Sequence, residues 1–388
     1  MGIVKSIPSD FDACDRISPA MQEEPKLRVK SRPLLKAVRR RSSNTSEDTE
    51  YSEDERFGDQ LMELGGIKYI IPQDEEEFDR LRLRHYMFRN MFQSNFSAPI
   101  KEQLEKGIQV LDAGCGPGTW VVEMATEYRN STFTGFEVSS IISQTSTHGL
   151  LPPNCSFRQI SLSGPLPFAD NTFDYIHMRI LGMVLSTERW MWMLSELKRI
   201  LKPGGYLEWL EHDLELKRRG PTSAFLNDQV MSCVQEFDID PTIGRKIVAF
   251  VQKAGFRSVE GDGYYLSLPI GRWGGRCGEM ARWDFEKVLR ATRRITQGDA
   301  YTDKEIDMLM EECMREFDEY KTFYNIHVCV AQNAEDKPLE ASLSDSGLEE
   351  KKRLEKLEHL GNVDKKFKRH AKKRVTSLLR KTSKENPF

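Results

Sequence analysis

Residues 108–120 constrain the fold most, because they place three glycines directly after an apolar run. Their sequence is Ile-Gln-Val-Leu-Asp-Ala-Gly-Cys-Gly-Pro-Gly-Thr-Trp, in which the apolar run ends at Asp112 and a helical pattern begins at the final Trp. The glycines are Gly114, Gly116 and Gly118. A strand, a tight glycine turn and a helix N-terminus form the arrangement in which open α/β sheets bind nucleotides at the carboxyl ends of their strands. The stretch therefore predicts a nucleotide-binding turn.

The glycine spacing and the preceding acid discriminate between nucleotides. A dinucleotide turn follows G-x-G-x-x-G and faces a pyrophosphate, but Thr119 stands where that pattern needs its third glycine. Asp112 would also lie beside the pyrophosphate, and buried like charges repel. The phosphate-binding loop G-x-x-x-x-G-K-[ST] is absent. S-adenosylmethionine carries no phosphate, and its α-ammonium and sulfonium groups suit a carboxylate. We expect this cofactor; a dinucleotide-dependent dehydrogenase and a turn without any ligand are the alternatives.

The rest of the middle region alternates between strand and helix patterns. Strands are predicted at 108–112, 131–137, 156–161, 173–178, 206–211, 258–268 and 322–331, and helices at 75–92, 98–106, 119–129, 187–201 and 248–255. This order implies a doubly wound α/β fold with right-handed crossovers. We predict a seven-stranded, mostly parallel sheet, with a helical insertion at about 270–320 before the last strand.

One further feature supports a nucleotide site. Glu137 ends the second predicted strand, 19 residues beyond Gly118. A carboxylate at that place can accept both ribose hydroxyls of an adenosine, although an exposed Glu at a strand end is the alternative. In the first helix, Asp74 and Glu77 have capping-box spacing, and an apolar stripe that includes His85 follows.

The two ends of the chain differ from the predicted domain at 61–331. Residues 1–60 are predicted to be a disordered charged tail, with eight basic residues in 26–41 and six acidic ones in 47–55. Residues 332–388 are predicted to form a basic, partly helical or disordered tail, with 14 Lys/Arg against 4 Asp/Glu in 351–388. Solvation, nuclear import, nucleic-acid contact and binding to an anionic membrane surface are alternatives for these tails. Residues 1–6 match the N-myristoylation pattern M-G-x-x-x-[ST].

Composition indicates a cytoplasmic or nuclear protein. The net charge is −3, and no apolar run approaches the ~18 residues of a membrane span. The seven cysteines include no C-x-x-C pair, so we expect reduced thiols and no metal site.

The residues of 66–331 resemble the class I S-adenosylmethionine-dependent methyltransferases and, more narrowly, the fungal LaeA-like methyltransferase group. The segments that carry the resemblance are 69–81 with His85, 110–120, 168–179 and 201–208. It implies S-adenosylmethionine as cofactor, a cofactor-covering helix around His85, and a methyl-transfer site bordered by His177. The cofactor-binding residues that it implies are Asp112, Ala113, Gly114, Gly116, Gly118, Glu137, Leu162, Ser163, His85 and Met178.

One position departs from the family pattern. Many relatives have an Asp that binds the adenine amino group, and Leu162 occupies that place here. Adenine recognition would then use backbone groups or the hydroxyl of Ser161 or Ser163. Losing a hydrogen bond to a charged acceptor weakens binding by about 1.5–3 kcal/mol, or tenfold and more.

The hypothesis for function is direct methyl transfer to an unidentified small-molecule or protein acceptor. Alignment can supply much of the rate because a sulfonium is a good leaving group. His177 is the first candidate for a general base, followed by His85, Glu211 and His212. The alternative is a non-catalytic, methyltransferase-like scaffold that acts through its charged tails and regulatory protein partners.

Overall fold

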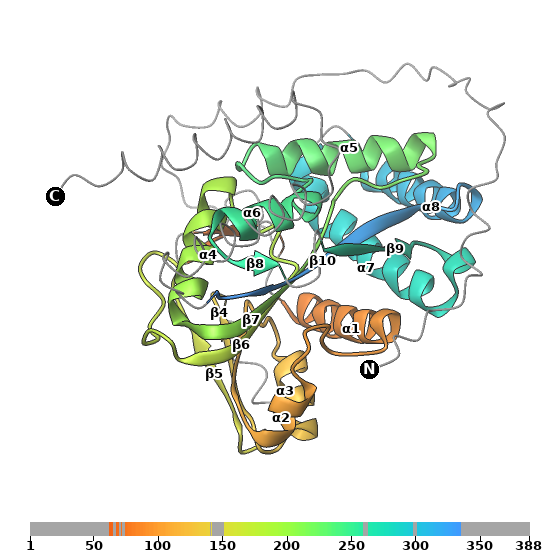
Figure 1. Cartoon of the computed structure of the whole chain (residues 1–388). Coiled ribbons are helices and arrows are strands. Elements are labelled where there is room, and N and C mark those ends of the chain that lie inside the picture. Colours follow the sequence, from red (N-terminus) through yellow and green to blue (C-terminus); the bar gives the residue numbers. More distant parts are fainter. Residues whose placement is uncertain are drawn as a thin grey trace, which may run out of the picture. The chain divides into compact units, whose positions relative to one another are not determined.

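Most of the middle of the chain is described by a computed structural model (Figure 1). The described residues are 62–64, 67–69, 71, 74–139, 141, 151–258, 263–297 and 301–334. The predicted N-terminal tail, its myristoylation pattern and the predicted C-terminal tail from residue 335 onward lie outside the described residues.

A mixed sheet of eight strands forms the centre of the domain, in the order β5-β4-β3-β6-β7-β10-β8, with β9 also paired to β10. The strands are β3 (Gln109–Ala113), β4 (Thr132–Glu137), β5 (Cys155–Gln159), β6 (Phe173–Arg179), β7 (Leu201–His212), β8 (Arg257–Ser258), β9 (Tyr264–Pro269) and β10 (Phe323–Gln332). Strands β3 to β7 are parallel, and β10 runs antiparallel to β7, β8 and β9. The doubly wound, mostly parallel architecture is therefore confirmed.

The predicted sixth strand is two strands that share one position in the sheet. Strand β8 pairs with the end of β10 at Ala331 and Gln332, whereas β9 pairs with its beginning, from Phe323 to Val328. Together they fill the seventh position, so the predicted number of strand positions holds. A separate hairpin of β1 (Met62–Leu64) and β2 (Ile67–Tyr69) was not predicted.

Eight α-helices accompany the described part of the sheet. They are α1 (Glu75–Phe92), α2 (Lys101–Lys106), α3 (Thr119–Glu127), α4 (Thr187–Ile200), α5 (Pro221–Gln235), α6 (Ile247–Lys253), α7 (Gly275–Gln297) and α8 (Asp303–Glu319). Helices α7 and α8 lie within the stretch predicted as an insertion, whereas α5 was not predicted. None of the helices in the described ranges is long and apolar enough to cross a membrane.

Helix α1 begins as its sequence predicts. The Asp74 carboxylate accepts the backbone N–H of Glu77 at 2.9 Å, and acidic residues fill the first turn, where they favour the positive end of the helix dipole. Phe78, His85 and Phe88 of the predicted stripe are buried. The N-cap prediction at Asp74 is thus confirmed.

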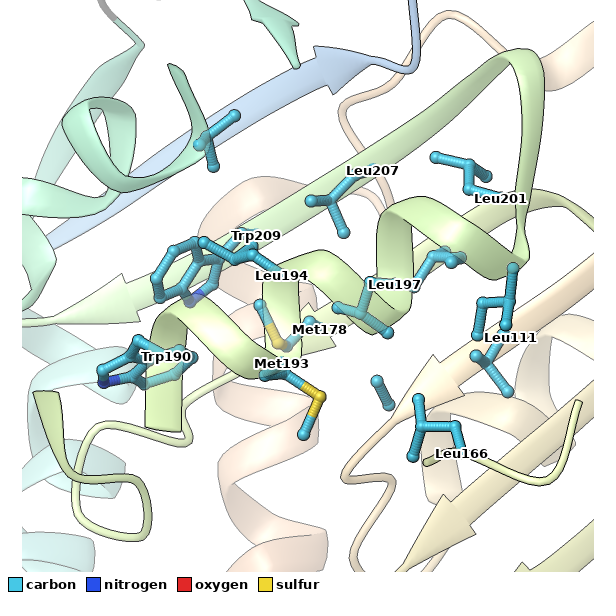
Figure 2. Packing of buried hydrophobic residues seen from close by; sticks show 14 of the residues in the cluster. Leu111, Leu166, Met178, Trp190, Met193, Leu194, Leu197, Leu201, Leu207 and Trp209 are labelled. Carbon is cyan, nitrogen blue, oxygen red and sulfur yellow. The ribbon is translucent and has the colours of Figure 1, made fainter. Parts of the chain in front are cut away.

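Helix α4 fixes the carboxyl ends of β6 and β7 from one face of the sheet. Its residues Trp190, Leu194 and Leu197 recur at helical spacing and are fully buried. Figure 2 shows them packed together with Met178 of β6 and Trp209 of β7. Burying each such side chain contributes about 1.5–3 kcal/mol, so this cluster makes a rigid base for the strand ends.

Helices α1, α5, α7 and α8 pack around a second buried cluster. It includes Phe88 of α1, Leu226 of α5, Leu289 of α7 and Phe317 of α8. In Figure 1, α1 and α7 lie beside each other, and these two helices are in contact. The insertion therefore packs directly on α1.

Candidate functional site

The glycine turn between β3 and α3 requires glycine for two reasons. Gly114, Gly116 and Gly118 have φ values of +73°, +53° and +71°, in the left-handed region that favours glycine. A Cβ atom would also lie 2.5 Å from Leu181 Cδ2 at Gly114 and 2.4 Å from Phe157 Cε1 at Gly118. The turn can therefore approach its neighbours closely only with these glycines.

A cleft opens beside this turn at the carboxyl edge of the sheet. Of the predicted cofactor-binding residues, five line it: Asp112, Gly114, Gly116, Glu137 and Leu162. Its apolar wall includes Leu81 of α1, Val138 and Ile141 beyond β4, Leu181 after β6, and Met193 of α4.

The other predicted site residues lie outside the cleft lining. They are Ala113, Gly118, Ser163, Met178, His85 and His177. Met178 packs in the core beneath the cleft, and Ser163 is exposed, with its N–H and hydroxyl both bonded to the Ser161 hydroxyl. Their predicted contacts with the cofactor stay predictions.

Asp112 and His177 form a buried pair on adjacent strands. They are register partners of β3 and β6, and Asp112 Oδ1 lies 2.7 Å from His177 Nδ1. Because an ionised carboxylate can only accept, the imidazole N–H is on Nδ1. Trp120 stacks on the imidazole, with 4.1 Å between the ring centroids and 4° between the ring planes. His177 thus holds the Asp112 carboxylate by a hydrogen bond and does not itself line the cleft. Its predicted role as general base stays a prediction.

Glu137 ties the end of β4 to the glycine turn. Its Oε2 accepts the N–H of Gly116 at 2.9 Å, and its Oε1 accepts those of Val138 and Ser139 at 2.7 and 3.2 Å. Burial raises the pKa of the Glu137 carboxyl despite these donors. A carboxylate has about four acceptor positions, so one stays open for a ligand hydroxyl.

Two arginines that the sequence analysis did not single out face the same cleft. Arg84 comes from α1, and Arg179 is the last residue of β6. Burial lowers the pKa of Arg179 to about 10, which leaves it charged at neutral pH. Its position at the carboxyl end of a parallel strand, where α/β sheets bind ligands, was the signal that could have found it.

His85 supports Arg179 from the side away from the cleft. Arg179 Nη2 lies 3.3 Å from His85 Nδ1, and since arginine only donates, Nδ1 is the acceptor. The proton is then on Nε2, which lies 2.5 Å from Glu123 Oε2. Burial lowers the pKa of His85 and favours this neutral form. Burial opposes ionisation of Glu123, but bonds from His85 and Arg89 hold its pKa at about 2.

Leu162 supplies an apolar wall where an acid was expected in relatives. Its side chain is buried and lines the cleft, and its carbonyl oxygen accepts a hydrogen bond from Arg189 Nη1 at 3.2 Å. This side chain can pack against a flat ring but offers no hydrogen bond to it.

The remaining candidate bases have structural partners. The Glu211 carboxylate accepts the N–H of Leu181 at 2.8 Å and that of His212 at 3.0 Å, which shapes the loop after β6.

Burial raises the pKa of Cys115 well above its ordinary value, so its thiol is not an activated nucleophile. Within the described ranges, no cluster of three or more His, Cys, Asp or Glu residues could hold a metal ion.

Comparison with known proteins identifies relatives of this chain. Residues 110–205 match the family model of a methyltransferase domain. The secondary metabolism regulator LAE1 of Cochliobolus heterostrophus is 31% identical over 150 residues, which are 38% of this chain and 47% of that protein. N-methyltransferase sirN of Leptosphaeria maculans is 24% identical, over 61% of this chain and 83% of that protein. Protein-methionine methyltransferase laeA of Emericella nidulans is 30% identical, over 38% and 37%. The chain thus spans less than half the length of LAE1 and of laeA.

Proposed function

We propose a function for the cleft from the premise that this chain carries a class I S-adenosylmethionine-dependent methyltransferase domain and resembles the LaeA-like group. The proposed function is binding of S-adenosylmethionine in the cleft beside the glycine turn and direct transfer of its methyl group to an acceptor. The observation that carries the proposal is the charge pattern of the cleft, in which two carboxylates and two guanidinium groups face one glycine turn.

The residues of the cleft fit this cofactor. Asp112 suits an α-ammonium group, and Arg84 or Arg179 suits an α-carboxylate, since charge-assisted hydrogen bonds are the strong ones. The open acceptor position of Glu137 suits a ribose hydroxyl. Leu162 and Val138 supply apolar surface for a flat base. A pyrophosphate would instead face both carboxylates, which argues against a dinucleotide.

The protein's own contribution is binding and alignment. When bound, S-adenosylmethionine supplies an electrophilic methyl group on a sulfonium. His177, on which Trp120 stacks, holds Asp112, and Glu137 holds the turn, so the amino-acid and ribose ends of the cofactor would be fixed before the acceptor arrives. Positioning of two reactants can account for about 7–11 kcal/mol of a barrier.

The acceptor is proposed to be a nucleophile that needs no strong base. Among the described residues that line the cleft, the titratable side chains are two acids, two arginines and one buried thiol, without His, Lys or Tyr. An uncharged amine or a thioether sulfur meets this condition. Such acceptors agree with the relatives named as an N-methyltransferase and a protein-methionine methyltransferase.

Calorimetric titration and a labelling assay test the proposal. Purified protein should bind S-adenosylmethionine and should not bind NAD at the same concentrations. Protein incubated with methyl-labelled cofactor and a cell extract should place label in a small-molecule or protein fraction. Absence of cofactor binding would refute the proposed function.

A second function is favoured by one observation. Leu162 is buried in the cleft lining and offers no acceptor for the adenine amino group. A binding protein that uses the methyltransferase fold without turnover would share this feature. This second function predicts that the protein binds the cofactor but transfers no label, even when every extract fraction is supplied in turn.

A further inference from the structure

Arg84 contacts the cleft on one side and the helical insertion on the other. Its guanidinium donates through Nε and Nη2 to Asp284 on α7, at 3.1 Å to Oδ1 and 2.9 Å to Oδ2. The same side chain lines the cleft. Nη1 makes no hydrogen bond to any of the described residues, so two of its five N–H groups are available to a ligand.

Asp284 is a buried carboxylate shared by two arginines. Its Oδ1 also accepts a bond from Arg80 Nη1 at 2.7 Å, and Arg80 in turn makes two bonds to Glu77, at 2.5 and 2.6 Å. Burial alone would raise the pKa of Asp284, but Arg84 and Arg80 hold it below its ordinary value. The two acids and two bases therefore form a chain of ion pairs between α1 and α7.

Asp112, Arg84 and Arg179 all line the cleft. His177, the register partner of Asp112, precedes Arg179 by two residues on β6, and Arg179 contacts His85, the neighbour of Arg84 on α1. The charges also influence one another, since Arg84 contributes to the lowered pKa of Arg179 and Asp112 opposes it. The cleft thus places cations and Asp112 at the same end. This arrangement matches a zwitterionic α-amino acid group, whose ammonium would meet Asp112 and whose carboxylate would meet Arg84.

We propose that Asp284 is a positioning residue that acts through Arg84, so that helix α7 of the insertion sets the affinity of the cleft for the amino-acid end of the cofactor. The proposal rests on the proposed function. Without Asp284, the Arg84 side chain regains rotamer freedom that ligand binding must then remove. Because that freedom amounts to about 2 kcal/mol for an arginine, the loss of affinity should be about five- to thirtyfold.

Two ligands distinguish positioning from general damage to the fold. S-adenosylhomocysteine contains the α-amino acid group and does not react, whereas 5′-methylthioadenosine lacks that group. Asp284→Asn should weaken binding of the first by about five- to thirtyfold in calorimetric titration and change binding of the second less than twofold. Glu286→Gln on the same helix, whose side chain pairs with the exposed Arg290, is the matched control and should change neither.

A double-mutant cycle tests the route through Arg84. In an Arg84→Met background, Asp284→Asn should change the affinity for S-adenosylhomocysteine less than twofold, because the residue through which it acts is gone. Asp284→Glu retains the charge that neutralises Arg80 and displaces the carboxylate by one methylene, so it should show the same ligand-selective loss if Asp284→Asn does not fold.

Three outcomes overturn the proposal. They are unchanged affinity in Asp284→Asn, equal losses for both ligands, and additive effects of the two substitutions. Wild-type protein that binds neither ligand would refute the proposed function itself. Wild-type binding with an unaffected Asp284→Asn refutes only this inference.

Discussion

Two substitutions of Asp112 separate its contact with a cofactor from its contact with His177. In wild type, His177 Nδ1 lies 2.7 Å from Asp112 Oδ1. Asp112→Asn keeps an amide oxygen that can accept this N–H but removes the negative charge. A hydrogen bond to a charged group contributes about 1.5–3 kcal/mol and a neutral one about 0.5–1.5 kcal/mol, so the Asn variant should lose about 1–1.5 kcal/mol of cofactor binding, or five- to thirteenfold in Kd.

Asp112→Ala removes both contacts. Cofactor binding should weaken by about 1.5–3 kcal/mol, or about 13- to 160-fold. The variant also leaves the Nδ1–H of His177 without its partner in a side chain that is 3% exposed. An unsatisfied buried donor costs about 1–3 kcal/mol, so the Ala variant should be less stable than the Asn variant by that amount.

Calorimetric titration with S-adenosylhomocysteine gives the two affinities, and urea unfolding gives the two stabilities. Glu105→Gln, an exposed acid on α2, is the control and should match wild type in both measurements. The reasoning is refuted if Asp112→Asn binds within twofold of wild type, or if the Ala and Asn variants unfold with the same free energy.

Three further results are expected. Gly118→Ala should lower the free energy of unfolding by about 2–4 kcal/mol in urea, from left-handed strain and displacement of the Phe157 ring; a change under about 0.5 kcal/mol contradicts this. Burial lowers the pKa of His85 in the folded state below the 6.5 of the unfolded state. As the pH falls below 6.5, His85 is therefore protonated in the unfolded state before it is protonated in the folded state. Wild type should lose stability over this range, by at most about 1.4 kcal/mol per pH unit. His85→Gln should remove that part of the pH dependence. If the free energy of unfolding in urea varies with pH identically in wild type and His85→Gln, this prediction is wrong. Leu162→Asp should tighten S-adenosylhomocysteine binding tenfold or more by calorimetry, at a cost of a few kcal/mol in stability; unchanged affinity would exclude this position as the adenine contact.

The order of strands and helices was predictable because its signals are local. An apolar run before three glycines, and the cap bond that Asp74 makes three residues along the chain, involve neighbours in sequence. The positive φ of the turn glycines is likewise a property of single residues. These patterns can be recognised without knowing which elements pack together.

Helix α5 was missed because its buried face is partly polar. Ser223 and Asn227 are buried there, and both are hydrogen-bonded: Ser223 to the carbonyl of Gly220, and Asn227 to the backbone of Leu214 and Leu216. These polar residues interrupt the apolar stripe that a sequence search requires. Their burial is permitted only by partners outside the helix.

The prediction of one continuous sixth strand overlooked the turn signal Gly261-Asp262-Gly263 within its sequence. Its division into β8 and β9 follows from their pairing with opposite ends of β10. That pairing also places β10 between β7 on one side and β8 and β9 on the other. Strand order depends on which edges meet, and no local pattern records it.

By itself, the sequence determined the glycine turn, the acids Asp112 and Glu137 beside it, and the class of cofactor that they suit. Only the tertiary structure decided which cations share the cleft and how they are held. The Arg84–Asp284 contact joins residues 200 positions apart, and the Arg179–His85 contact joins residues 94 apart. Such pairs form because helices α1 and α7 and strand β6 pack together. That packing cannot be inferred from the spacing of residues along the chain.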